Sequence, residues 1–218
     1  MKRISILLVV LMTTPFFCFS QTLKDINKAI IEGLDEVAPF NEGLAAVRKG
    51  NQWGFIDKSG KLVIDFRKDL VWNKDADKTR QDVMGVRYPS FKDGRCLVKE
   101  LKEEGIAHYG FIDKAGKIVI EPEYLNVTEF DQGNAIGIFS RKSFRGKSEI
   151  KVDVFDYVFT EAVVNTSGEM IWPIGERDNI LMSKRRYELP ELRAKLLSEN
   201  LLTVKNKDNH WEIRKLDL

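Results

Sequence analysis

The side chains that most often carry out catalysis or bind metals are scarce in this chain of 218 residues. It has two histidines, His108 and His210, and two cysteines, Cys18 and Cys96. Zinc sites need such ligands at short, clustered spacings, and these four residues are scattered. The sequence also lacks a Gly-x-Ser-x-Gly motif, a phosphate-binding glycine loop and a dinucleotide fingerprint. We therefore expect no catalytic residue, no metal site and no cofactor.

Two acidic residues recur in the same setting. Asp57 and Asp113 each stand three residues before a glycine, Gly60 and Gly116, and residues 165–168 repeat the pattern with asparagine in place of aspartate. Repeated acids invite a catalytic interpretation. However, aspartate at the first position of a tight turn accepts hydrogen bonds from backbone amides, and glycine at the fourth adopts a positive φ. We therefore interpret both acids as turn caps.

The sequence offers one candidate binding loop, within the insertion at residues 140–153. Its cations and one aromatic residue are Arg141, Lys142, Phe144, Arg145, Lys147 and Lys151. These cations are suited to an anionic partner, and Phe144 is suited to stacking on a base or sugar. A solvated hairpin is the alternative interpretation. If the loop binds, neutralising its five cations should abolish binding and leave folding intact, because binding residues concentrate on loops.

The N-terminus predicts a secretory signal peptide over residues 1–20. A basic start precedes an apolar run from Ile4 to Phe17, and Ser20 precedes the predicted cleavage point. The run is too short and too interrupted to span a bilayer. A role for Cys18 as a lipid acceptor is disfavoured, because bulky residues precede it where small ones are required. We expect export to the periplasm or the extracellular space, with no transmembrane segment after cleavage.

The charge balance argues against a nucleic-acid partner. The chain has 35 lysines and arginines against 33 acidic residues, and the predicted signal peptide contains Lys2 and Arg3 but no acid. The mature protein would thus be neutral, with no global field to attract nucleic acid. Cys96 would then be the last cysteine, unable to form an intrachain disulfide. It aligns with Ala45 of a repeated segment, which favours a buried apolar role over a reactive thiol.

The dominant feature of the chain is a segment that occurs twice. Residues 40–64 contain Phe-Asn-Glu-Gly-Leu-Ala-Ala-Val and then Trp-Gly-Phe-Ile-Asp-Lys-Ser-Gly-Lys-Leu-Val-Ile. Residues 91–120 contain Phe-Lys-Asp-Gly-Arg-Cys-Leu-Val and then Tyr-Gly-Phe-Ile-Asp-Lys-Ala-Gly-Lys-Ile-Val-Ile. A degenerate third copy, residues 130–173, has Glu161 and Ala162 where the first has tryptophan and glycine. This period predicts repeats that bury their apolar surfaces against one another.

Each repeat predicts a meander of three antiparallel strands. In the first copy, residues 44–47, 53–57 and 62–64 are β-favouring runs separated by turn residues. Both faces of the middle strand carry apolar residues, so neighbouring units should cover both. Gly54 and Gly110 are expected to permit a close approach of other chain segments. The pattern is compatible with an open array and with a closed barrel or propeller-like sheet.

The predicted fold is all-β, an array of antiparallel β-meander or hairpin repeats with a small C-terminal helix-plus-hairpin cap. Leucines at helical spacing predict a helix over residues 188–200, followed by a hairpin over residues 202–216. The predicted segments are an N-terminal lead-in or cap helix at 21–39, a repeat region at 40–173 with units at about 40–66, 91–124 and 130–173, and the cap at 174–218. Insertions at 67–82 and 140–153 should leave the sheet as exposed loops or extended hairpins.

The repeated residues resemble the WG-repeat (KWG-repeat) family, which occurs mostly in bacterial exported and cell-surface proteins. The resemblance covers about residues 34–173. The family has no recurring catalytic site, so the resemblance implies a non-catalytic binding or scaffolding module. We expect its partner to be a cell-envelope or extracellular protein, or a glycan. The alternative is an enzyme or enzyme inhibitor that uses the inserted loops 67–82 and 140–153.

Overall fold

The structure is a computed structural model that describes residues 26–217. The chain divides into two compact regions, residues 1–32 and 33–218. The predicted signal peptide lies outside the described residues. Residues 28–33 contain no regular element, so this part of the predicted lead-in is irregular. Within residues 26–217, no helix is long and apolar enough to cross a membrane.

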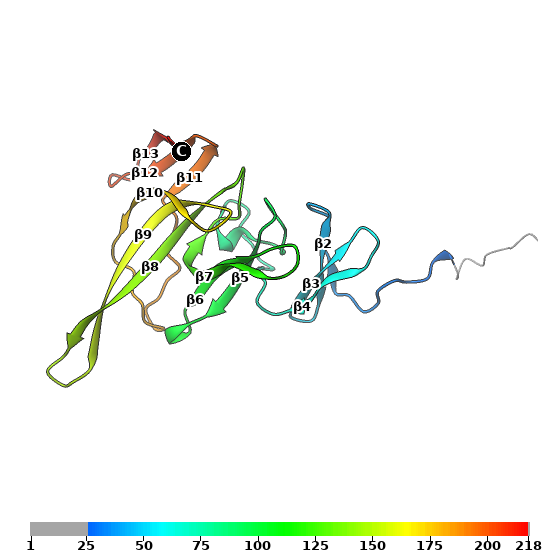
Figure 1. The fold of residues 1–218 in the computed structure, drawn as a ribbon, viewed down its shortest axis with the longest axis horizontal. Coiled ribbons are helices and arrows are strands. Elements are labelled where there is room, and N and C mark those ends of the chain that lie inside the picture. Colours follow the sequence, from blue (N-terminus) through cyan, green and yellow to red (C-terminus); the bar gives the residue numbers. More distant parts are fainter. Residues whose placement is uncertain (1–25, 218) are drawn as a thin grey trace, which may run out of the picture. The chain divides into compact units, whose positions relative to one another are not determined.

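The region 33–218 contains three antiparallel sheets (Figure 1). The first contains β1 (Glu36–Val37), β2 (Leu44–Lys49), β3 (Gln52–Asp57) and β4 (Leu62–Arg67). The second has the spatial order β10-β9-β8-β7-β6-β5, with β5 (Cys96–Leu101), β6 (Ala107–Ile112), β7 (Ile118–Val127), β8 (Asn134–Lys147), β9 (Asp153–Asn165) and β10 (Met170–Arg177). The third contains β11 (Ala194–Ser198), β12 (Leu201–Lys205) and β13 (Trp211–Lys215). Each sheet has two edge strands, so none closes into a barrel.

The predicted all-β meander occurs four times in these sheets. Unit 1 is β2–β4, unit 2 is β5–β7, unit 3 is β8–β10, and the terminal meander is β11–β13. Strand β7 is long enough to pair with both β6 and β8, which joins units 2 and 3 into one sheet. Short 3-10 turns at Val83–Gly85 and Glu103–Gly105 are the other regular elements between β1 and β13.

The interpretation of the repeated acids as turn caps is confirmed. The Oδ1 atom of Asp57 accepts hydrogen bonds from the backbone amides of Ser59 and Lys61 at 2.8 and 3.0 Å. Asp113 and Asn165 make the equivalent bonds in units 2 and 3. The glycine that ends each turn has a positive φ, as predicted: Gly60 (82°), Gly116 (81°) and Gly168 (81°).

The terminal meander contains the same turn in a form that the sequence conceals. Asn206 Oδ1 accepts hydrogen bonds from the amides of Asp208 and His210 at 3.0 and 2.9 Å. Asn209, with a φ of 65°, takes the place of the glycine, and asparagine is one of the few residues that tolerates this conformation. The C-terminal hairpin predicted from the sequence is therefore part of a fourth, divergent meander.

A second turn recurs before each of the first three units. Glu42 and Gly43 both have positive φ values (48° and 87°), and Asn41 and Leu44 exchange backbone hydrogen bonds around them. This is a two-residue hairpin turn, for which glycine is favoured. Residues 93–94 and 132–133 form the same turn. The side chain of each acidic turn residue reaches the next unit: the Gly94 amide donates to Glu42 at 3.0 Å, and the Gly133 amide donates to Asp93 at 2.7 Å.

Apolar cores lie between consecutive units, as the two-faced sheets predict. Phe55 of unit 1 packs on Phe91 with ring centroids 4.8 Å apart, within a core that also contains residues of unit 2. Phe111 of unit 2 packs on Phe130 at 4.6 Å, within a core shared with unit 3. The equivalent residue of unit 3, Val163, lies in a core shared with the terminal meander. Each unit thus buries its apolar faces against its neighbours.

The predicted helix over residues 188–200 is wrong. Residues 188–193 have no regular structure, and β11 follows. Leu189, Leu192 and Leu196 do not share one face: Leu189 packs against the core of units 2 and 3, whereas Leu196 packs against the core below the terminal meander. The predicted helix-plus-hairpin cap is therefore replaced by a three-stranded sheet.

The two insertions differ. Residues 140–153 belong to an extended hairpin of β8 and β9, as predicted, which projects beyond the neighbouring strands in Figure 1. Residues 67–82 are only partly exposed, contrary to prediction. Leu70 is 1% exposed and bridges to Val98, and Asp82 is 5% exposed. Both ends of this insertion are held in place because Leu70 forms an antiparallel bridge with Val98 and Asp82 forms one with Thr128.

Cys96 occupies the apolar position predicted from its alignment with Ala45. It is 1% exposed in the core between units 1 and 2, and burial raises the pKa of its thiol. We predict that the native protein does not react with a disulfide reagent, because the reactive thiolate is neither formed nor accessible. Absorbance measurement should show one reactive thiol only after denaturant is added. Rapid labelling of the mature native protein would contradict this assignment.

The glycines at the WG position are required by a backbone contact. A Cβ atom at Gly110 would lie 2.4 Å from the carbonyl oxygen of Ile120, and one at Gly54 would lie 2.8 Å from that of Ile64. We predict that Gly110→Ala lowers the free energy of unfolding by about 2–3 kcal/mol, because backbone atoms must shift to admit the methyl group. Gly175→Ala is the matched control, since a Cβ there meets no atom within 4 Å. Equal urea midpoints for the two variants would refute the packing role.

Candidate binding groove

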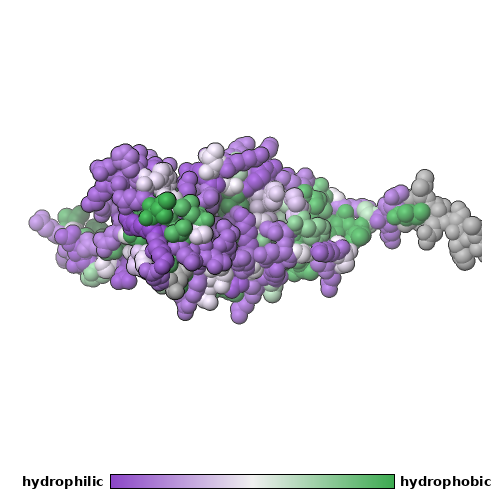
Figure 2. Space-filling view, turned by 90° about the horizontal axis from the view of Figure 1, so that it is seen from above, coloured by the Kyte–Doolittle hydropathy of each residue, from purple (hydrophilic) through white to green (hydrophobic). Residues whose placement is uncertain are grey.

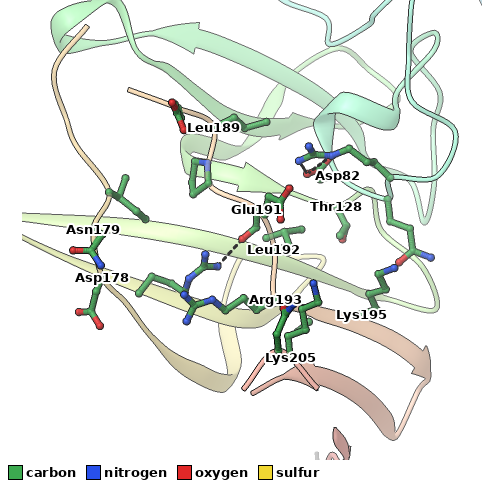
Figure 3. Close-up of a pocket in the computed structure, with 18 of the residues that line it drawn as sticks. Asp82, Thr128, Asp178, Asn179, Leu189, Glu191, Leu192, Arg193, Lys195 and Lys205 are labelled. Atoms are coloured by element: carbon green, nitrogen blue, oxygen red, sulfur yellow. Dashed lines mark hydrogen bonds and ion pairs between the residues drawn. The ribbon is translucent and has the colours of Figure 1, made fainter. Parts of the chain in front are cut away.

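An open groove of about 1310 Å³ lies within the region 33–218. Three stretches of chain line it: residues 77–82 of the first insertion, the irregular connecting segment between β10 and β11 (residues 178–193), and the terminal meander (Figure 3). Most of the lining side chains are charged or carry amide or hydroxyl groups. The groove lies where the regular stacking of units ends.

A buried ion pair holds one side of the groove. The Glu161 carboxylate, 1% exposed, accepts a hydrogen bond from Arg177 Nη1 at 2.6 Å. Its other oxygen accepts hydrogen bonds from the amides of Arg193 and Ala194 at 2.7 and 3.0 Å. Arg177 Nη1 also donates to the carbonyl of Glu191 at 2.6 Å. Glu161 therefore fixes the start of β11 against unit 3.

A second buried network holds the opposite side. Asn126 is fully buried, and its Nδ2 atom donates to Asp82 and to the carbonyl of Pro190, both at 2.8 Å. Asp82 is also paired with Arg80 and accepts a hydrogen bond from the amide of Met84 at 3.1 Å. The carbonyls of Pro190 and Glu191 and the amide of Arg193 are thus bonded to side chains from units 2 and 3, without a helix.

Glu161 was visible in the sequence only as a deviation. It stands in unit 3 where Trp53 stands in unit 1, and Trp53 is fully buried. In unit 3, a carboxylate replaces the aromatic ring, and a hydrogen-bonded contact to the next meander replaces an apolar one. The deviation that makes the third repeat degenerate is therefore what attaches the terminal meander.

A cationic cluster lines the groove and consists of Arg193, at the end of the connecting segment, with Lys195, Lys205 and Lys207 of the terminal meander. None of the four forms an ion pair with any residue in the range 26–217. The Lys205 amide donates to the Arg193 carbonyl at 2.7 Å, which holds the two positions together. Figure 3 shows Arg193, Lys195 and Lys205 near one another at one end of the groove, away from Asp178 and Asn179.

Trp211 stands beside these cations. It is 47% exposed, whereas Trp53 is buried. The ammonium groups of Lys195 and Lys205 lie 5.3 and 5.6 Å from its ring centroid, within the range of cation–π contacts. As the first aromatic residue of a hairpin strand, Trp211 resembles Trp53 in the sequence. The turn at Asn206 instead aligns it with Leu62, the first residue of the third strand, which explains its exposure.

The candidate binding loop lies elsewhere, on the β8–β9 hairpin, and none of its residues lines the groove. Arg145 pairs with Asp156 at 3.5 Å, Lys147 pairs with Asp153 at 3.7 Å, and Lys142 pairs with Glu103. The ring of Phe144 packs on Phe155 across the hairpin with centroids 5.7 Å apart. Arg141 and Lys151 are exposed. The binding role of this loop stays a prediction.

The surface contains no broad apolar face in the view of Figure 2, which is largely hydrophilic with separate apolar patches. Within residues 26–217, no group of three histidine, cysteine or acidic side chains could hold a metal ion. His108 is 8% exposed, and its Nδ1 atom lies 3.2 Å from the carbonyl oxygen of Ile106. Burial lowers the pKa of this imidazole. His210 is exposed on the terminal meander.

Comparison with protein families identifies the repeated units. The model described as the WG-containing repeat matches residues 27–53, 53–69 and 109–136. These three matches confirm the resemblance to the WG-repeat family that the repeated residues indicate. The matches end at residue 136, so most of unit 3 and the terminal meander are recognised as repeats from their strands and turns. No curated protein and no solved structure matches the chain significantly.

The Glu161 contact predicts how the terminal meander depends on unit 3. Glu161→Ala should lower the free energy of unfolding by about 3–5 kcal/mol, because it leaves Arg177 buried without its counter-ion. Glu212→Ala is the control, since its contact with Arg214 is exposed and such pairs contribute less than about 1 kcal/mol. Thermal unfolding measures the difference, and limited proteolysis should show faster cleavage within residues 178–193. Equal stability of the two variants would contradict the role assigned to Glu161.

Proposed function

We propose that the protein is a non-catalytic, exported binding module that presents the groove beside the terminal meander to another envelope protein or to a glycan. The observation that carries this proposal is the unpaired cationic cluster next to an exposed tryptophan. Like charges held close together repel one another, so this cluster favours an anionic partner at its end of the groove. The acidic lining residues Asp77, Asp178, Glu188 and Glu191 come from the first insertion and the connecting segment. Trp211 adds a flat apolar surface, which is typical of recognition sites.

The repeats give this groove a rigid support. The buried networks around Glu161 and Asn126 fix the connecting segment on both sides of the groove, through contacts between residues far apart in the chain. Binding residues on a fixed scaffold lose less conformational entropy when a partner binds. Export is inferred from residues 1–20 of the sequence. It is consistent with a role in which a stable scaffold displays a surface outside the cytoplasm.

A pull-down from envelope extract tests the proposal with two sets of substitutions, which remove three positive charges from the groove and five from the candidate binding loop. One purified variant carries Lys195→Gln, Lys205→Gln and Lys207→Gln in the groove. The other carries glutamine at all five cations of the candidate binding loop. We expect the groove variant to lose the captured partner, identified by mass spectrometry, and the loop variant to retain it.

Circular dichroism should show that both variants remain folded, because exposed charges contribute little to stability. Loss of the partner from the loop variant alone would support the hypothesis drawn from the sequence and refute the groove. Equal retention by both variants would also exclude the cationic cluster as the binding site.

A further inference from the structure

The chemistry of the groove restricts what its partner can be, if the proposed binding function holds. At one end, the cations without an ion-pair partner are Arg193, the last residue of the connecting segment, Lys195 of β11, Lys205 of β12 and Lys207 of the turn that follows β12. Lys195 and Lys205 lie on neighbouring strands, and each has its ammonium group within 6 Å of the Trp211 ring centroid. Two positive charges beside one ring are suited to a ligand that combines a flat apolar face with negative groups.

A sugar ring meets the first half of this requirement. One face of a pyranose presents C–H groups, which pack on an aromatic surface, while its hydroxyls project from the edge. Trp211 is 47% exposed, so the ring surface that the ammonium groups of Lys195 and Lys205 do not cover is open to such packing. A carboxylate on the same sugar would reach the ammonium groups beside the ring and form charge-assisted hydrogen bonds.

Neutral polar groups complete the groove. The side chains of Gln81, Asn179 and Asn209 line it, are exposed, and have no hydrogen-bond partner in the described part of the chain. Each amide provides both donors and an acceptor, the combination that sugar hydroxyls require. These three residues come from the first insertion, the connecting segment and the terminal meander, so the groove offers hydrogen bonds along its length.

The groove is less suited to an apolar peptide. Of its apolar lining residues, Ile180, Leu189 and Leu192 already pack against the cores of the protein, and Leu181 is 51% exposed. It therefore has no deep apolar pocket for an anchoring side chain, such as peptide grooves use. Its volume of about 1310 Å³ exceeds the range of about 300–1,000 Å³ that is usual for single small ligands. A polymer fits better than one small molecule.

We infer that the groove binds an acidic polysaccharide, with a uronic-acid residue stacked on Trp211 and its carboxylate between Lys195 and Lys205. The remaining cations, Arg193 and Lys207, contact neighbouring acidic sugars of the same chain. The amides of Gln81, Asn179 and Asn209 hydrogen-bond to hydroxyl groups. This inference rests on the proposed binding function and names the class of its partner.

Isothermal titration of the purified protein with polygalacturonate tests this inference. Fully methyl-esterified polygalacturonate is the matched ligand, because it keeps the sugar rings and removes the charge. We expect binding of the acidic polymer, weakening as salt rises, and binding of the ester that is weaker by about tenfold or more. No binding of polygalacturonate, or equal binding of both polymers, would overturn the inference.

Variants then locate the site. Lys195→Gln with Lys205→Gln should weaken binding by about tenfold or more, and Trp211→Ala should do so without changing the charge of the protein. Lys58→Gln with Lys117→Gln removes the same charge from the exposed turns of units 1 and 2 and should leave binding unchanged. An equal loss in this control would show general attraction of a polyanion and refute the site. Unchanged melting temperatures establish that the groove variants are folded.

Polyglutamate separates sugar recognition from anion recognition. It should bind more weakly than polygalacturonate and be insensitive to Trp211→Ala. Binding of polyglutamate that is equally tight and equally dependent on Trp211 would show that the partner is an acidic peptide. If no polysaccharide binds and the groove variant still loses its partner in the pull-down, the proposed function stands and the glycan inference fails.

Discussion

The architecture depends on one constraint: each unit is a thin sheet with apolar residues on both faces. Phe55 and Ile56 of unit 1, like Phe111 and Ile112 of unit 2, are adjacent in a strand and therefore point to opposite sides. Such a sheet cannot be stable in water by itself, because covering one face leaves the other exposed. Stacking satisfies both faces. It also explains the small residues Cys96 and Ala135, which face the preceding unit and allow it to approach.

The stack must end, and the terminal meander shows how. Leu202 and Val204 stand at the positions of Trp53 and Phe55 relative to the turn, yet they pack against unit 3, the unit that precedes them. The terminal sheet thus presents the opposite face to the stack. Its outer side carries Lys195, Lys205 and Trp211. The charged groups on this side remain in contact with water, so no further unit has to cover it. Capping and the formation of the groove are two results of the same reversal.

The sequence predicted what is decided locally. The tight turns follow from an acid or asparagine placed three residues before a glycine, and the two-faced strands follow from alternation within five or six residues. The failed helix over 188–200 shows the limit: its leucines have helical spacing, but Asn126 and Glu161, 64 and 32 residues from their partners, supply the hydrogen bonds that keep the segment extended. The groove depends on the same distant contacts. Only the unusual glutamate at position 161 signalled them.

The hydrogen bonds between consecutive two-residue turns have a consequence for how such a protein changes in evolution. Glu42 reaches the Gly94 amide, and Asp93 reaches the Gly133 amide, so the offset between units is fixed at the turns. The lengths of the segments between the turns do not set this offset. The exposed tip of the β8–β9 hairpin, which contacts neither turn, can therefore lengthen or shorten while the stack keeps its alignment. Such a segment can gain or lose codons, provided that Glu42 and Asp93 and the glycines that they contact are kept.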